Sequence, residues 1–151
     1  MIRANVPPNI EQQIKSILDN SNELIKCCDF GKAELLLLKA WFLLPEPKLS
    51  WDYHPQILAK LLMNCYTQLK NPGKAHDWMI IVREAYEATH IGDDPCVDFW
   101  EAQMNYELGL QEEAFNSFHS IYKKFKKRPF KGRDSKYLDF YFSKAKEKQF
   151  I

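Results

Sequence analysis

The sequence holds few of the residues that break helices or make tight chain reversals. Only 5 of its 151 residues are glycine, and no stretch of useful length alternates apolar and polar residues as a half-buried strand would. Leu, Lys, Glu, Ala and Gln, which favour helices, are plentiful instead. Scarce glycine and missing strand patterns therefore argue against a turn-rich β fold and predict an all-α protein.

The residue patterns of common catalytic and metal sites are missing as well. The histidines are His54, His76, His90 and His119. No two of them stand three or four residues apart, so no metal pair on one helix face is expected. No glycine-rich phosphate loop occurs, the acids at 93–94 lack the further ligands of a calcium loop, and no local signature marks a nucleophilic cysteine. We expect no enzyme activity, no cofactor and no metal.

Long apolar runs and spaced cysteine pairs are also absent. The longest apolar stretches, Leu35–Leu38 and Ala40–Leu44, are separated by Lys39 and are far too short for a membrane span. Residues 1–9 lack the apolar core of a signal peptide. The four cysteines, two of them adjacent at 27–28, have no C-x-x-C spacing and are interpreted as small buried hydrophobes. These absences predict a cytoplasmic protein with no membrane role.

The charges are unevenly distributed although the net charge is only +1. Between Glu84 and Tyr122 there are nine acids and no Lys or Arg, whereas Lys123 to Arg133 holds seven basic residues and no acid. The acidic stretch is either a solvated face or a surface complementary to a basic partner. The basic run is interpreted as a solvated helix end. Because Phe125 within that run is expected in the core, we predict no nucleic-acid binding.

Helical periodicity divides the chain into about seven helices, whose ends are marked by Pro, Gly, Asn and Asp. The first follows Pro7–Pro8, and the second, Lys32–Leu44, is apolar nearly all round, which predicts burial. The others are expected at Gln56–Lys70, Lys74–His90, Pro95–Leu108, Glu112–Lys127 and Asp134–Lys148. The long loop between the second and third helices, with Trp51, Tyr53 and His54, is the other candidate for binding. Within it, Trp51 is expected to fold back on the core, and Tyr53 is left open between core and binding edge.

Small residues recur at comparable positions just after three turns. They are Ala33, Ala75 and Ala114, spaced by 42 and 39 residues. Four residues later stand Leu37, Met79 and Phe118, and three residues beyond those stand Ala40, Val82 and Ile121. A small residue lets two antiparallel helices approach closely, and the larger apolar residues fill the space between neighbouring pairs. The pattern therefore predicts a helical repeat.

This pattern resembles the tetratricopeptide repeat over about residues 10–127, most clearly from Tyr106–Gly109 through Ala114 and Phe118. The resemblance implies a short right-handed α–α superhelix, a single domain 1–151 of three degenerate helix pairs at about 10–45, 55–90 and 94–127. A last helix over about 134–148 would act as the cap. The segments Ala40–Asp52 and Gly132–Phe140 resemble a group of small bacterial stand-alone proteins of this family, which implies a bacterial cytoplasmic protein.

In such arrays the first helix of each pair lines a concave groove, and this register selects candidate binding residues. Those singled out are Asn22, Lys60, Asn64, Phe99, Gln103 and Tyr106. Their neighbours on the same faces are Lys15, Leu18, Ile25, Ile57, Thr67 and Cys96. Lys60 and Asn64 match two members of a carboxylate clamp, but Trp100 stands where an Asn is expected, so no clamp is predicted. Alternatively, Phe99 and Tyr106 pack against the last helix.

These observations predict a protein-binding module without catalysis. The first hypothesis is an immunity protein that binds and neutralises a cognate bacterial toxin, with Asp94, Asp98 and Glu101 meeting a basic toxin domain. The alternative is an adaptor or chaperone that binds a peptide or a secreted effector in the concave groove, through Lys60 and Asn64. The partner is another protein in both cases, and the oligomeric state is left open.

Overall fold

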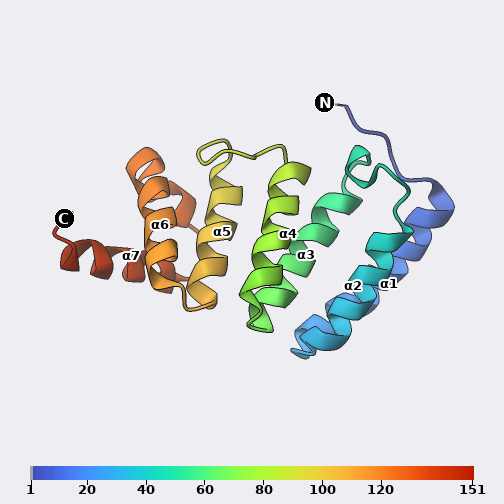
Figure 1. The fold of residues 1–151 in the computed structure, drawn as a ribbon, viewed down its shortest axis with the longest axis horizontal. Helices are drawn as coiled ribbons and strands as arrows, with labels where there is room; N and C mark the ends of the chain where they lie inside the picture. The colour runs from blue at the N-terminus through green and yellow to red at the C-terminus, as the bar shows by residue number, and fades with distance from the viewer. Residues whose placement is uncertain (1) are drawn as a thin grey trace. The chain divides into compact units, whose positions relative to one another are not determined.

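The computed structural model describes residues 2–151, and this part of the chain is all-helical (Figure 1). Its helices are α1 (Pro8–Lys26), α2 (Phe30–Leu43), α3 (His54–Gln68), α4 (Pro72–Ala85), α5 (Pro95–Glu107), α6 (Gln111–Phe125) and α7 (Ser135–Glu147), with short 3₁₀ turns η1 (Lys48–Ser50) and η2 (Arg128–Phe130). The only β-type pairing within residues 2–151 is one isolated bridge between Ala4 and Trp51. The all-α prediction is confirmed.

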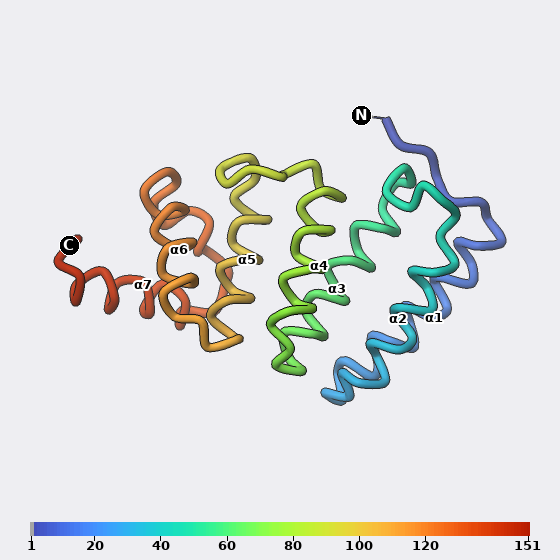
Figure 2. Tube along the Cα trace, in the orientation of Figure 1, coloured from blue at the N-terminus to red at the C-terminus, as the bar shows by residue number. Residues whose placement is uncertain are grey.

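The chain divides into two compact units. Unit 1 ends at Glu87 and holds α1 to α4, and unit 2 comprises Ala88–Ile151 with α5 to α7. Within each unit consecutive helices pack against each other, as the trace in Figure 2 lets the reader follow. The prediction of a single domain stays a prediction.

The turns inside the three helix pairs share one hydrogen-bond pattern. In each, an N–H just past the first helix donates to a carbonyl five residues earlier, which is the Schellman closure of a helix end. These bonds run from Asp29 to Leu24, from Asn71 to Tyr66 and from Leu110 to Asn105, at 2.8–3.0 Å. The carbonyl of the same closing residue then accepts from the N–H of Ala33, Ala75 or Ala114. The three aligned alanines therefore occupy one structural position.

Burial follows the same repeat. Ala33, Ala75 and Ala114 are fully buried. The apolar residues that stand four and seven positions after each of these alanines are at most 1% exposed. This is the arrangement expected where a small residue permits close helix contact and its neighbours fill the space beside it. The sequence pattern thus correctly marked the helix–helix contacts of the first, second and third pairs.

Two of these three closures place a residue other than glycine in the left-handed region. Cys28 has φ 59° and Lys70 has φ 56°, whereas the third position is Gly109 at φ 79°. Changing the exposed Cys28 to glycine is expected to raise the free energy of unfolding by about 0.5–1 kcal/mol, because the clash of Cβ with the backbone disappears. Urea denaturation of the two proteins measures the difference.

The neighbouring Cys27 supplies the control for that substitution. Cys27 is also exposed but has an ordinary φ of −86°. Cys27→Gly should therefore lower stability, since glycine only adds flexibility to the unfolded chain there. Equal effects of the two substitutions would contradict a left-handed strain at Cys28.

Some predicted details are corrected by the structure. Helix α4 ends at Ala85 and not at His90, because Glu87 turns to φ 55° and its N–H bonds back to Glu84. Helix α2 is not buried all round: Leu35 is 66% and Phe42 73% exposed. The apolar residues of this helix outnumber the positions that its neighbours cover.

The interpretation of the four cysteines as buried residues is also wrong for three of them. Only Cys65 is buried, where burial, followed by the charge of Glu34, raises the pKa of its thiol to about 11. The adjacent pair at 27–28 is exposed in the turn that ends α1, and Cys96 is exposed in the first turn of α5. All four are free thiols.

Candidate functional site

A groove of about 490 Å³ lies in unit 1, lined by one face of α1 and the start of α3. Helix α1 contributes Glu11, Lys15, Leu18, Asp19 and Asn22. The other wall consists of Tyr53, His54, Ile57 and Leu61. Lys15, Leu18, Asn22 and Ile57 were predicted to share an inner face, because they lie on the first helices of two pairs. The structure brings these four residues together.

The groove combines an apolar part with charges on α1. Leu18, Ile57 and Leu61 are half-buried and leave apolar surface open to the groove. Glu11 and Lys15 lie one helical turn apart and both are exposed. Neither makes an ion pair or a side-chain hydrogen bond with any part of the chain from residue 2 onward. The groove can therefore offer both apolar contact and unpaired charge to a bound segment.

Tyr53 stands at the end of this groove in a strained backbone conformation. Its φ of 68° and ψ of −59° match the rare γ-turn, and the carbonyl of Asp52 accepts the His54 N–H at 2.8 Å, which closes that turn. A bulky residue at such dihedral angles costs on the order of 1–3 kcal/mol. Tyr53 is nevertheless 57% exposed, so the fold holds it at the surface.

The N-terminal segment fixes the loop that carries Tyr53. The Asp52 N–H donates to the Ala4 carbonyl at 2.8 Å, and Ala4 also bridges to Trp51. Val6 is buried and anchors this segment. The indole of Trp51 is half-buried and donates to the Pro45 carbonyl of the same loop at 2.8 Å. Tyr53, left open by the sequence, is the exposed aromatic residue of the loop.

His54, which belongs to the candidate loop with Trp51 and Tyr53, also lines the groove. Its side chain is only 8% exposed, and its buried Nδ1 has no hydrogen-bond partner among residues 2–151. Its ring meets that of Tyr53 edge-on, with centroids 5.1 Å apart.

Two other predicted residues on α3 lie outside the groove lining. Lys60 is half-buried and Asn64 is exposed, but neither belongs to the walls of the cavity. Asn22 on α1 does line it and is exposed. Of the inner-face residues in the second pair, Thr67 is buried and donates to the Met63 carbonyl at 2.8 Å.

In unit 2 the predicted binding residues serve mainly the internal structure. Asp94 caps α5 by accepting from the N–H groups of Cys96 and Val97. Asp98 is 4% exposed and accepts from the Gly92 N–H at 2.8 Å. Both acids thus satisfy backbone donors at the start of this helix, and Glu101 on the same helix is half-buried.

The aromatic residues of α5 pack against α7, as the alternative prediction for them stated. Phe99 is fully buried, with its ring 5.7 Å from that of Tyr137. Tyr106 lies 5.2 Å from Tyr137 and 5.1 Å from Phe140, and Gln103 hydrogen-bonds the Tyr137 hydroxyl. The expectation that Asp98 and Phe99 face a partner is therefore corrected: the folded unit leaves almost none of either side chain accessible.

The Tyr137 hydroxyl donates to Glu107 at 2.8 Å. Burial, followed by this hydrogen bond, raises the pKa of Tyr137 to about 12. Glu107 also pairs with Lys136 at 2.9 Å. Glu107, one of the nine acids between Glu84 and Tyr122, therefore holds α7 against the end of α5 and is not a free surface charge.

The described residues hold no cluster of three or more His, Cys, Asp or Glu side chains able to bind a metal ion. None of the helices in residues 2–151 is long and apolar enough to cross a membrane. No family model, no curated protein and no solved structure matches the chain. A function has to be inferred from the chemistry of the groove.

Proposed function

We propose that the chain is a non-enzymatic protein-binding module related to tetratricopeptide repeats, and that it binds a peptide segment of another protein in the α1–α3 groove. The observation that carries this proposal is the groove itself, where exposed Tyr53 and unpartnered His54 meet apolar and charged residues of α1 and α3. Aromatic anchors beside a small number of polar groups are typical of protein recognition sites.

The groove also indicates the chemistry of the segment. An apolar side chain of the peptide would cover Leu18, Ile57 and Leu61, which gains free energy by removing apolar surface from water. A charged residue of the peptide would pair with Glu11 or Lys15 on the rim. This is the adaptor or chaperone function predicted as the alternative, with its site moved from Lys60 and Asn64 toward the N-terminal half of α3.

The immunity hypothesis finds less support in the structure. It relied on Asp94, Asp98 and Glu101 as a surface for a basic toxin, and the first two are engaged with the backbone of unit 2. A carboxylate that already accepts backbone hydrogen bonds gains less from a cationic partner than a free one does. Neutralisation of a toxin would instead have to use the groove.

The test is peptide selection followed by binding measurements on groove variants. A displayed peptide library should yield segments with an apolar anchor, and their binding is measured by fluorescence anisotropy. Ile57→Asp puts a charge on the apolar wall and is expected to weaken the selected peptides about tenfold or more. Circular dichroism establishes that the variant keeps its helices.

Ile80→Asp is the matched control, because Ile80 is 59% exposed on α4 of the same unit and does not line the groove. Binding by this variant should equal that of the unchanged protein. The proposal fails if the library gives no enriched peptide, or if both aspartate variants reduce binding equally.

A further inference from the structure

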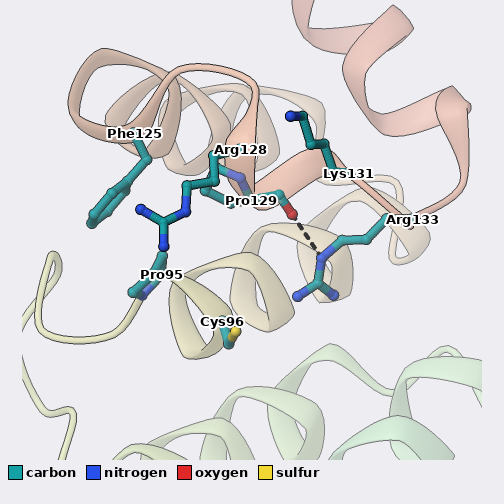
Figure 3. A pocket seen from close by; sticks show the side chains of 8 residues that line it. Pro95, Cys96, Phe125, Arg128, Pro129, Lys131 and Arg133 are labelled. Atoms are coloured by element: carbon teal, nitrogen blue, oxygen red, sulfur yellow. Dashed lines mark hydrogen bonds between the residues drawn. The ribbon is translucent and has the colours of Figure 1, made fainter.

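A second cavity, independent of the proposed groove, lies entirely within unit 2. Its volume is about 610 Å³ (Figure 3). The first turn of α5 forms one side with Pro95 and Cys96, and Phe125 at the end of α6 forms another. The remaining wall is η2 and the residues after it, namely Arg128, Pro129, Lys131, Gly132 and Arg133. We call this the arginine cavity.

The arginine cavity is lined by three basic residues and no acidic one. In Figure 3 the guanidinium groups of Arg128 and Arg133 lie on either side of Cys96, whereas the Lys131 ammonium points away. Arg128 and Lys131 are exposed, and within residues 2–151 neither has an ion pair or a side-chain hydrogen bond. Two guanidinium groups thus flank an open space with unused donors and uncompensated charge.

Arg133 is held in position by the fold. Its Nε donates to the Pro129 carbonyl at 2.9 Å, and its guanidinium carbon lies 4.1 Å from the centre of the Phe99 ring. These contacts leave the terminal nitrogens of the fork available. Phe130 between the two arginines is 6% exposed, so the short turn that carries both is anchored in the core. Little conformational freedom remains to be lost when a ligand binds Arg133.

The N–H groups at the start of α5 do not contribute to binding a ligand, because the Asp94 carboxylate already accepts from Cys96 and Val97. An anion in the cavity must therefore be held by the arginine side chains. A guanidinium matches the oxygens of phosphate with two parallel hydrogen bonds. A dianion also balances two guanidinium groups, which a single carboxylate does not.

We propose that the arginine cavity binds a phosphate monoester carried on an apolar or aromatic body. The phosphate contacts Arg128 and Arg133, and the body packs against Pro95, Phe125 and Pro129. The volume of the cavity indicates that the phosphate is attached to a larger body. Cavities of about 300–1,000 Å³ accommodate whole small molecules or side chains, and a bare phosphate needs far less space. Such a group can belong to a phosphorylated tyrosine side chain or to a free nucleotide.

Phenyl phosphate is the probe for the first experiment. Titration of the isotope-labelled protein, followed by amide NMR shifts, should give saturable binding with a dissociation constant on the order of 1 mM, localised to Cys96 and to the non-proline residues of 125–133. Arg128→Gln removes one guanidinium that makes no ion pair or hydrogen bond within residues 2–151, and it should weaken binding about tenfold. Arg133→Lys, which keeps the charge but loses the fork, should weaken it as well.

Lys123→Gln is the matched control, since it removes one positive charge from the same basic run outside the cavity. It should leave the dissociation constant within about twofold at 0.15 M salt, where distant charges are screened. Equal weakening by Lys123→Gln and Arg128→Gln would overturn the proposal, since binding would then reflect general charge. Absence of saturation, or binding of phenol as tight as that of phenyl phosphate, would also overturn it.

Two further ligands identify the source of the phosphate. A short peptide containing phosphotyrosine and adenosine monophosphate are titrated beside inorganic phosphate. Tighter binding of either than of inorganic phosphate supports the proposal and names the body that the cavity accepts. If all three bind equally, the apolar walls contribute nothing and the proposal fails.

Discussion

Replacing Phe99 with alanine is expected to lower the free energy of unfolding by about 3–5 kcal/mol, a large fraction of the stability of an ordinary domain. Phe99 is fully buried at the centre of the aromatic core of unit 2. Its ring lies 5.3 Å from Phe118, 5.2 Å from Phe130 and 5.7 Å from Tyr137, in edge-on geometry each time. Alanine would remove these contacts and leave a cavity where the elements of the unit meet.

Thermal and urea denaturation measure this loss, and hydrogen exchange locates it. We expect the amides of α5 to α7 to lose protection, because the removed ring joins all three helices. Phe42→Ala is the matched control: the same substitution on α2, where the side chain is 73% exposed, should change stability by less than about 0.5 kcal/mol. A loss under about 1 kcal/mol for Phe99→Ala would show that Phe99 does not hold the unit together.

The second prediction concerns Tyr53, where stability and binding should change in opposite directions. Tyr53→Gly removes the strain of a side chain at φ 68° and is expected to stabilise the protein by about 1–2 kcal/mol relative to Tyr53→Ala, which keeps a Cβ there. Both substitutions delete the exposed ring at the end of the groove. Both should therefore weaken a groove-bound peptide about tenfold, as expected for an aromatic anchor.

Comparing glycine with alanine separates the two effects. Urea denaturation gives the stability difference, and fluorescence anisotropy with a selected peptide gives the loss of binding. If glycine were no more stable than alanine at position 53, the backbone there would carry no strain. If peptide affinity survived in both variants, Tyr53 would be an exposed loop residue without a role in recognition, and binding would depend on the other residues of the groove.

Strain at Tyr53 and an unpartnered nitrogen on its neighbour His54 occur at the same point of the groove. Strain and unsatisfied polar atoms both lower stability, and proteins retain them mainly where function requires a fixed geometry. The N-terminal segment supports this geometry by pairing Ala4 with the loop, so the residues before α1 belong to the site although they line none of it. The geometry of the proposed binding groove therefore depends on contacts between segments about 50 residues apart in the chain.

The sequence by itself determined the helices and their packing positions. Scarce glycine, helical periodicity and the three spaced alanines depend on local properties: helix propensity, the 3.6-residue period and the need for small residues where helices cross. These predicted seven helices and placed Ala33, Ala75 and Ala114 correctly in the core. Where a helix end depended on the backbone conformation of one ordinary residue, as at Glu87, the prediction was wrong by several residues.

Only the tertiary structure decided which charged and aromatic side chains remain accessible. Asp98 and Phe99 looked like a binding face, but one satisfies a backbone donor and the other fills the core. Arg128 and Arg133 looked like part of a solvated helix end, but a short turn anchored by buried Phe130 sets them around one cavity. Local periodicity shows which side chains share a helix face, whereas exposure depends on what distant segments place against that face. The elements therefore follow from the sequence, and the two candidate sites follow from the packing.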